Sequence, residues 1–152
     1  MKRRILLVDD DLAVLLTLKA VLELHGFEVE TAGSSTEAFA RMTSGVYQMV
    51  ISDLRMESEE AGLEVIRTAR RQAYDPATAL LTAYPPPGDH WGGKPREGED
   101  WAGENSGSLL IKPLGTADLV RQIEALLVGQ ADKQERQKNS AYKAQEAKRH
   151  AG

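Results

Sequence analysis

Four short apolar runs in this chain each end in residues that carry a charge or a hydroxyl group. They are 5–8, followed by Asp9, Asp10 and Asp11; 48–53, which ends in Asp53; 78–82, which ends in Thr82; and 108–112, which ends in Lys112. Apolar runs of this length are typical of buried strands in a parallel sheet. The carboxyl ends of parallel strands meet at one edge of the sheet, where open α/β sheets bind ligands. The sequence therefore predicts that these polar groups share one site.

The segments between these runs predict helices and one further strand. Apolar residues in 12–24 recur at three- and four-residue spacing, and Gly26 suits the left-handed position that follows a helix. Further helices are predicted from Ser34 or Ser35 to Met42, over 62–72 and from Thr116 onward, and residues 27–32 alternate as a strand does. Regular alternation of strands and helices favours a doubly wound, mostly parallel α/β sheet.

One helix is missing from this alternation. Residues 85–107 lie where a helix should connect the last two strands, but they are rich in proline and glycine and have no helical period. We therefore predict that the fourth helix of the regular pattern is replaced by a loop or shortened to one turn.

The residue types at the strand ends suit phosphoryl transfer. The carboxylates of Asp9 and Asp10 offer the oxygen ligands that Mg²⁺ prefers. Asp53 could act as a nucleophile, Thr82 could donate a hydroxyl hydrogen bond, and Lys112 could neutralise phosphoryl oxygens. For Asp11 we expect an ordinary role as the N-cap of the next helix.

Composition excludes several other classes of protein. The chain has 152 residues, no cysteine and a net charge of −4. It therefore forms no disulfide or thiolate metal site, and its charge gives no reason to expect direct binding to nucleic acid. No apolar run is long enough for a membrane-spanning helix, and the short basic start does not predict a signal peptide. A cytoplasmic location is the expectation, without membrane attachment.

The charge is distributed unevenly along the chain. Residues 129–152 contain six Lys or Arg and three Asp or Glu, whereas residues 1–128 contain 13 Lys or Arg and 20 Asp or Glu. The body is thus acidic and the tail basic. We predict one domain over 1–128, followed by a polar tail over 129–152 that is either a helical extension or disordered, because it has no apolar stripe.

With these residues at these positions, the chain resembles the receiver domain of bacterial two-component response regulators, including the chemotaxis regulators. The resemblance covers residues 4–128 and is carried by the segments 5–10, 51–56, 81–83 and 111–114. It implies a flavodoxin-like sheet of five parallel strands in the order 2-1-3-4-5, for which a chemotaxis member of this family is an established example.

The resemblance also implies a role for each site residue. Asp53 resembles the aspartate that accepts the phosphoryl group, and Asp9 and Asp10 resemble the acidic pair that holds Mg²⁺ together with Asp53. The backbone carbonyl of Arg55 corresponds to a further metal ligand of the family. Thr82 resembles the switch hydroxyl, and Lys112 resembles the lysine that pairs with the phosphoryl group.

Three departures from the family pattern affect the expected output surface. The segment 57–61 lacks the usual proline and carries extra acidic residues, and Leu109 stands where the family has an aromatic switch residue. The segment between Thr82 and Lys112 is also longer than usual and unlike a helix.

The favoured function is that of a single-domain response regulator in a phosphorelay. The expected partners are a sensor histidine kinase or a histidine phosphotransfer protein, together with a downstream protein target, and a homodimer is left open. As an enzyme it would at most phosphorylate itself from small donors and dephosphorylate itself. Two alternatives remain: a degenerate receiver that acts as a constitutive scaffold, and a phosphohydrolase of the haloacid-dehalogenase type that uses Asp9 and Asp11.

Overall fold

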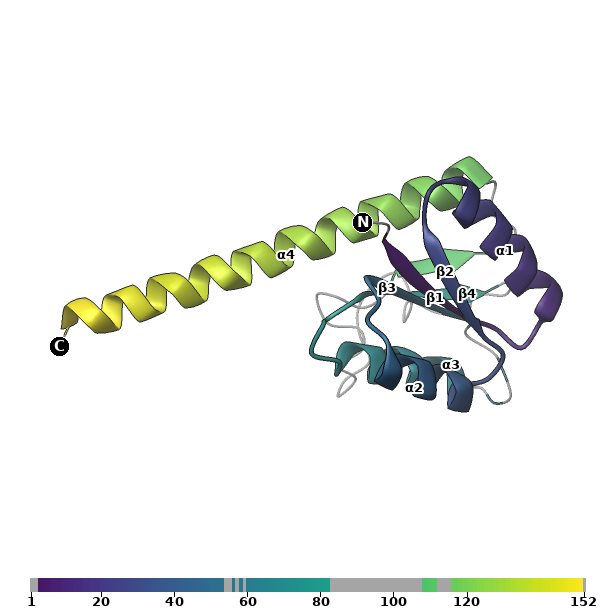
Figure 1. Cartoon of the computed structure of the whole chain (residues 1–152), viewed down its shortest axis with the longest axis horizontal. Helices are drawn as coiled ribbons and strands as arrows, with labels where there is room; N and C mark the ends of the chain where they lie inside the picture. The colour runs from purple at the N-terminus through teal and green to yellow at the C-terminus, as the bar shows by residue number, and fades with distance from the viewer. Residues whose placement is uncertain are drawn as a thin grey trace, which may run out of the picture.

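Five parallel strands form a single sheet in this protein (Figure 1). The computed structural model describes residues 3–53, 56, 58, 60–82, 108–111 and 116–151. The strands are β1 (Arg4–Val8), β2 (Glu28–Ala32), β3 (Met49–Asp53), β4 (Ala77–Thr82) and β5 (Ser108–Ile111). Their order in the sheet is β2-β1-β3-β4-β5. The predicted parallel α/β sheet and its flavodoxin-like order are confirmed.

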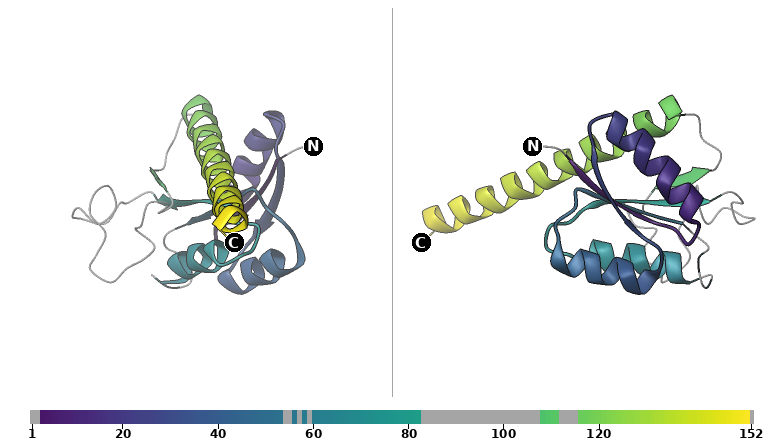
Figure 2. Two further views of the ribbon diagram at one scale, coloured as in Figure 1. Left: turned by 90° about the vertical axis from the view of Figure 1, so that its left-hand side faces the viewer. Right: turned by 45° about the vertical axis from the view of Figure 1, so that its right-hand side comes forward.

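Helices cover both faces of the sheet, as a doubly wound fold requires (Figure 2). One face carries α1 (Leu12–Leu24) and α4 (Thr116–Ala151), and the other carries α2 (Ser35–Ser44) and α3 (Ala61–Arg70). The predicted loop over 85–107, in place of a fourth helix, lies outside the described residues.

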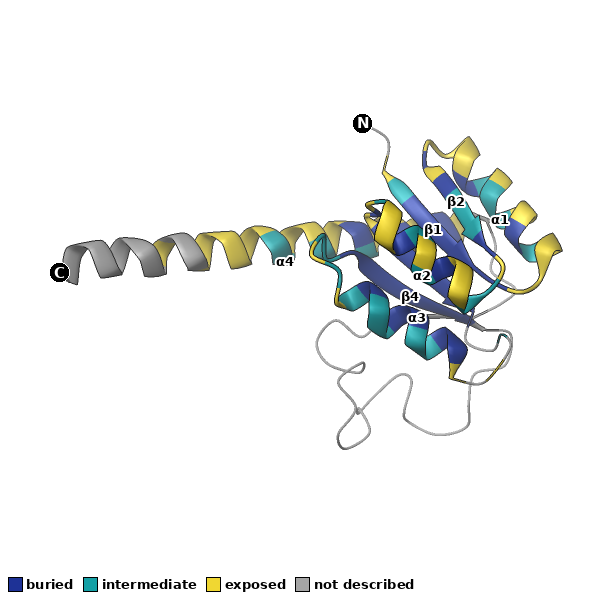
Figure 3. Ribbon diagram, turned by 60° about the horizontal axis from the view of Figure 1, so that its bottom comes forward, coloured by how far each residue is buried: buried dark blue, intermediate teal, exposed yellow. Residues whose placement is uncertain are grey.

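The core consists of two apolar clusters, one on each face of the sheet. Residues of β1, β3 and β4 pack with α1 and with α4 residues such as Leu119 and Ile123 on one side. The opposite side of the same strands packs with Ala38 and Met42 of α2 and with Val65 of α3. The central strands are buried on both sides, which explains why their sequences read as continuous apolar runs (Figure 3).

The ends of α1 and α2 are formed by the residues that the sequence predicted. The side chain of Asp11 caps α1, and Ser34 caps α2 by accepting a hydrogen bond from the amide of Glu37. Gly26 follows α1 with a φ of +89°, a conformation that side chains disfavour. Helix α2 ends at Ser44, two residues beyond the predicted end at Met42.

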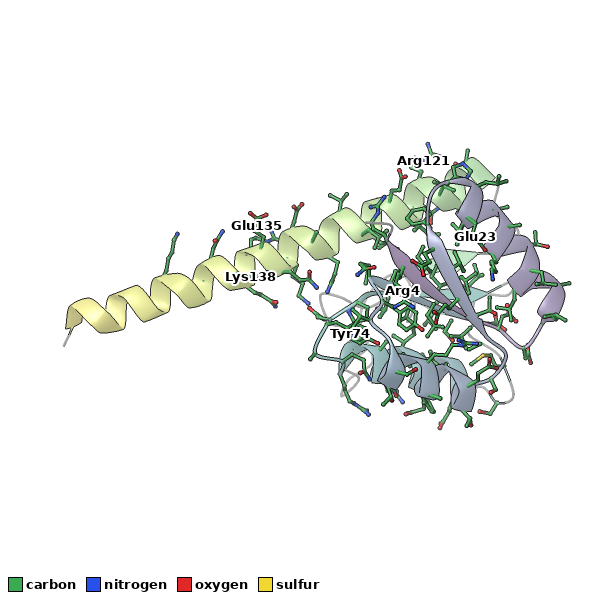
Figure 4. The ribbon with its side chains drawn as sticks, viewed as in Figure 1. Arg4, Glu23, Tyr74, Arg121, Glu135 and Lys138 are labelled. Atoms are coloured by element: carbon green, nitrogen blue, oxygen red, sulfur yellow. The ribbon has the colours of Figure 1, made fainter. Side chains whose placement is uncertain are left out.

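Helix α4 continues well beyond the sheet (Figure 1). It contains 36 residues and passes the predicted domain boundary at residue 128 without a break. At 1.5 Å per residue the helix is about 54 Å long. Glu135 and Lys138 lie on the part that extends away from the body (Figure 4). No helix in the described part of the chain combines the length and apolar character that crossing a membrane requires.

Polar side chains hold α4 where it leaves the sheet. The side-chain amides of Gln130 and Gln134 each donate to the carbonyl of Asp75 at 2.8 Å. Asp75 precedes β4 and has a φ of +44°, which is unusual for a residue other than glycine. Lys133 adds an ion pair with the Asp75 carboxylate at 4.0 Å. A polar contact therefore replaces the apolar stripe that this part of the helix lacks.

A second polar network ties β1, β2 and α2 together near the amino ends of the strands. Arg4 pairs with Glu30 at 2.6 Å, and Arg41 of α2 reaches the same carboxylate at 3.5 Å. The hydroxyl of Tyr47 donates to Glu30, and the guanidinium of Arg4 lies 4.9 Å from the centre of the Tyr47 ring. The Tyr47 hydrogen bond lowers the pKa of Glu30; burial opposes this effect and the two arginines add to it.

Candidate functional site

Two aspartates on neighbouring strands form the centre of the candidate site. Asp9 directly follows β1, and Asp53 is the last residue of β3. The register that pairs Val8 with Ser52 continues to place Asp9 beside Asp53. Both side chains are largely buried, with exposed fractions of 3% for Asp9 and 9% for Asp53. Parallel pairing thus brings together two carboxylates that are 44 positions apart in the chain.

Asp10 completes a group of three carboxylates. One carboxylate oxygen from each of Asp9, Asp10 and Asp53 lies within 4.8 Å of the corresponding oxygens of the other two. Asp10 is exposed, so the group opens to solvent on one side. The three residues that the sequence predicted as side-chain ligands are therefore adjacent in the structure.

The donor set fits a hard divalent cation. All three groups offer carboxylate oxygens, which magnesium prefers to nitrogen or sulfur ligands. Neighbouring oxygens on an octahedral magnesium ion are about 2.9 Å apart, given metal–oxygen distances of 2.0–2.1 Å, and at most one pair among three ligands can lie on opposite sides. The three oxygens, which lie within 4.8 Å of one another, would therefore draw closer together around a bound ion. A bound cation would also offset the mutual repulsion of three clustered negative charges.

Of the other three predicted site residues, the structure describes the backbone of Thr82 but not Arg55 or Lys112. The backbone of Thr82 ends β4 one position beyond Leu81, which is the register partner of Asp53. It is itself the register partner of Ile111, the residue before Lys112. Lys112 and Arg55 lie outside the described residues. The strand pairing places the Thr82 backbone at the same sheet edge as the carboxylates, and the roles of all three residues remain predictions.

Ser52 is a buried polar residue that the sequence analysis did not single out. Its side chain is fully buried, and its hydroxyl donates to the backbone carbonyl of Asp53 at 3.1 Å. The sequence signal that could have identified Ser52 is its hydroxyl group within an otherwise apolar strand. The contact satisfies the buried hydroxyl and links it to the chain segment that carries the central carboxylate.

A cavity lies at the opposite edge of the sheet. It has a volume of about 260 Å³ and is bordered by Tyr47, Tyr74, Val128 and Gln134 among others. Tyr47 precedes β3, and Tyr74 precedes β4, so this cavity adjoins the amino ends of the strands. It is therefore separate from the carboxylate group, which lies at the carboxyl ends.

Comparison with known protein families identifies a match over most of the sheet. The model of the "Response regulator receiver domain" family matches residues 5–89. The transcriptional regulatory protein PrrA of Mycobacterium tuberculosis is 32% identical over 124 residues, which cover 82% of this chain and 49% of PrrA. The chain thus spans about half the length of this curated relative.

Solved structures show the same architecture. The CheY-like receiver domain protein of Methanospirillum hungatei has a TM-score of 0.71 and 25% identity, and the match covers 88% of this chain and 99% of that one. The response regulator TrrA of Thermotoga maritima, solved in complex with Mg²⁺ and BeF, has a TM-score of 0.64 and 31% identity. That match covers 82% of this chain and 98% of TrrA.

Proposed function

Since the chain belongs to the response regulator receiver domain family, we propose that Asp53 is the residue that accepts a phosphoryl group. The observation that carries this proposal is the group of three carboxylate oxygens, from Asp9, Asp10 and Asp53, within 4.8 Å of one another. Asp53 is the last residue of the central strand and is 9% exposed, so the strand pairing fixes the position of its backbone.

We propose that Asp9, Asp10 and Asp53 hold a magnesium ion, with the backbone carbonyl of Arg55 as a further ligand. When bound, the ion would neutralise charge on the phosphoryl oxygens. Support comes from the oxygen-only donor set and from the related TrrA, which was solved with Mg²⁺ and BeF. The alternative function, a phosphohydrolase of the haloacid-dehalogenase type, would need Asp9 and Asp11 to act together. In this structure the Asp11 carboxylate instead caps α1.

The proposed reaction is a transfer between two proteins. A carboxylate oxygen of Asp53 attacks the phosphorus of a phosphohistidine on the donor. The new bond joins oxygen to phosphorus, and the phosphorus–nitrogen bond breaks, leaving its electron pair on the imidazole. Lys112 would pair with the phosphoryl oxygens, and the Thr82 hydroxyl would donate a hydrogen bond to one of them. Both residues would thereby stabilise the negative charge on these oxygens during the transfer. Water then hydrolyses the acyl phosphate and restores Asp53.

The proposal makes the protein a regulator that takes up one phosphoryl group at a time, rather than an enzyme with many turnovers. The proposed donor is a sensor histidine kinase or a histidine phosphotransfer protein in the cytoplasm. The added phosphoryl charge would shift the surface that a downstream protein recognises. Domain limits of 1–128 for the receiver and 129–152 for the tail are part of this proposal.

Phosphorylation by a small donor tests the proposal directly. Wild type and Asp53→Asn are incubated with acetyl phosphate, with Mg²⁺ or with a chelator, and intact masses are measured. We expect one added phosphoryl group in wild type with Mg²⁺, and none in the other three samples. Circular dichroism of Asp53→Asn checks that the variant is folded. An adduct that forms equally in Asp53→Asn would contradict the assignment of the acceptor.

A further inference from the structure

The turn between β1 and α1 holds the buried carboxylate of Asp9 in a defined orientation. The backbone amide of Asp11 donates to Oδ1 of Asp9 at 3.0 Å. The amide of Asp9 itself donates to the carbonyl of Ala32 at 3.1 Å, which continues the pairing of β1 with β2. Asp9 is thus anchored at both its backbone and its carboxylate, within a side chain that is only 3% exposed.

The Asp11 side chain fixes the amide that makes this contact. Its Oδ1 accepts hydrogen bonds from the amides of Ala13 at 3.0 Å and Val14 at 3.3 Å. Its carbonyl accepts from the amide of Leu15 at 3.1 Å, and its backbone is extended, with φ −92° and ψ 106°. These three contacts restrain the backbone of Asp11, which carries the amide of the peptide between Asp10 and Asp11. The amide that reaches Asp9 belongs to that peptide.

Asp11 is a poor candidate for a direct ligand. Its carboxylate is engaged with the first turn of α1, and the cluster of close ligand oxygens found among the described residues contains Asp9, Asp10 and Asp53 instead. Its effect on a cation at the cluster therefore has to pass through the turn. A residue that orients a ligand in this way raises metal affinity because the ligand does not lose orientational freedom on binding.

We propose that Asp11 is a positioning residue for the cation site: by capping α1, it holds the amide that orients the Asp9 carboxylate toward the ion. This inference rests on the proposed magnesium site. It assigns to the third aspartate of the run a role distinct from those of its two neighbours, which supply oxygens to the ion.

Magnesium binding to three variants of the full chain tests this role. Asp11→Ala removes the cap, Asp11→Asn retains a capping oxygen but removes the charge, and Ser34→Ala removes the equivalent cap from α2. Dissociation constants for Mg²⁺ alone are measured by isothermal titration calorimetry. Urea unfolding is recorded for the same samples, so that loss of a helix cap can be separated from loss of orientation.

We expect Asp11→Ala to weaken magnesium binding about tenfold or more, the effect usual for residues that orient metal ligands. Asp11→Asn and Ser34→Ala should bind within about threefold of wild type, and Ser34→Ala should lose stability much as Asp11→Ala does. Equal weakening by Asp11→Ala and Asp11→Asn would overturn the inference in favour of a charge effect. Unchanged binding in Asp11→Ala would overturn it while the magnesium site stands. If wild type bound no Mg²⁺, both the site and the inference would fail.

Discussion

The hydroxyl of Tyr47 offers a quantitative test of the network at the amino edge of the sheet. Tyr47 is 1% exposed and its hydroxyl donates to the carboxylate of Glu30. Tyr47→Phe removes this hydroxyl and leaves the ring that packs in the core. A hydrogen bond to a charged group contributes about 1.5–3 kcal/mol to stability.

The structure favours the lower end of that range. After the change, Glu30 keeps Arg4 at 2.6 Å and Arg41 at 3.5 Å, and a third of its side chain remains exposed. Water can therefore replace part of the lost contact. We expect Tyr47→Phe to lower the free energy of unfolding by about 1.5 kcal/mol at neutral pH.

The loss should depend on pH because the acceptor is ionised. The pKa of Glu30 is lower in the folded protein than its ordinary value of 4.5, chiefly because of the Tyr47 hydrogen bond. A lowered carboxyl pKa contributes stability that is present above the unfolded pKa and is lost as the pH falls through the folded pKa. The difference between wild type and Tyr47→Phe should therefore be largest at neutral pH and shrink below the unfolded pKa.

Tyr74→Phe provides a matched control in the same region. Its ring meets the Tyr47 ring edge-on at 6.5 Å, but its hydroxyl donates to the neutral carbonyl of Met42 at 3.1 Å. This variant should lose about 1 kcal/mol at neutral pH and the same amount in acid.

Urea unfolding, followed by circular dichroism across this pH range, measures both variants. The reasoning is refuted if Tyr47→Phe loses under about 0.5 kcal/mol at neutral pH, or if its loss does not change between neutral and acidic solution.

Three further predictions concern α4 and the tyrosines. Ile123→Ala should cost about 3 kcal/mol in urea unfolding because it empties a fully buried site under α4, and a loss under about 1 kcal/mol would show that the helix contributes little to the core. Replacing Gln130 and Gln134 together by alanine should speed amide exchange in the helix beyond residue 130, since both hydrogen bonds to the Asp75 carbonyl are lost while the Lys133 ion pair with Asp75 remains; unchanged exchange would contradict the proposed role of these hydrogen bonds. Burial raises the pKa of Tyr47 and of Tyr74, so stability should fall as the pH rises above about 10, where the unfolded tyrosines ionise, and this fall should be smaller in Tyr47→Phe.

The central sheet and the carboxylate site could be predicted because both depend on short-range pattern. An apolar run predicts a buried strand, and the residue that follows it lies at the sheet edge whatever the rest of the chain does. The positions of Asp9 and Asp53 follow from that rule alone, and the register of Val8 with Ser52 confirms their proximity. The cap on α1 could be predicted in the same way, since Asp11 stands directly before the helical period.

The Glu30 network could not be predicted because it depends on four segments of the chain coming together in space. In the alternating strand, Glu30 reads as an ordinary solvent-facing residue. Its two arginine partners lie on different elements, and Tyr47 precedes a third. No local period marks such a meeting of side chains. For Ser52 the sequence shows a hydroxyl within an apolar run, but it does not show that the partner of this hydroxyl is the backbone carbonyl of Asp53.

The extent of α4 shows where pattern-based prediction reaches its limit. The absence of an apolar stripe beyond residue 128 left a helical extension and disorder as open alternatives, because an apolar stripe is the sequence signal by which a docked helix is recognised. In the structure the helix is instead held by hydrogen bonds from the side-chain amides of Gln130 and Gln134 to the Asp75 carbonyl. That carbonyl precedes β4 at the amino edge of the sheet. The same continuous helix packs Leu119 and Ile123 into the core nearer its start. Gln130 and Gln134 hold the helix where it leaves the sheet, so the projecting segment is the continuation of a docked helix.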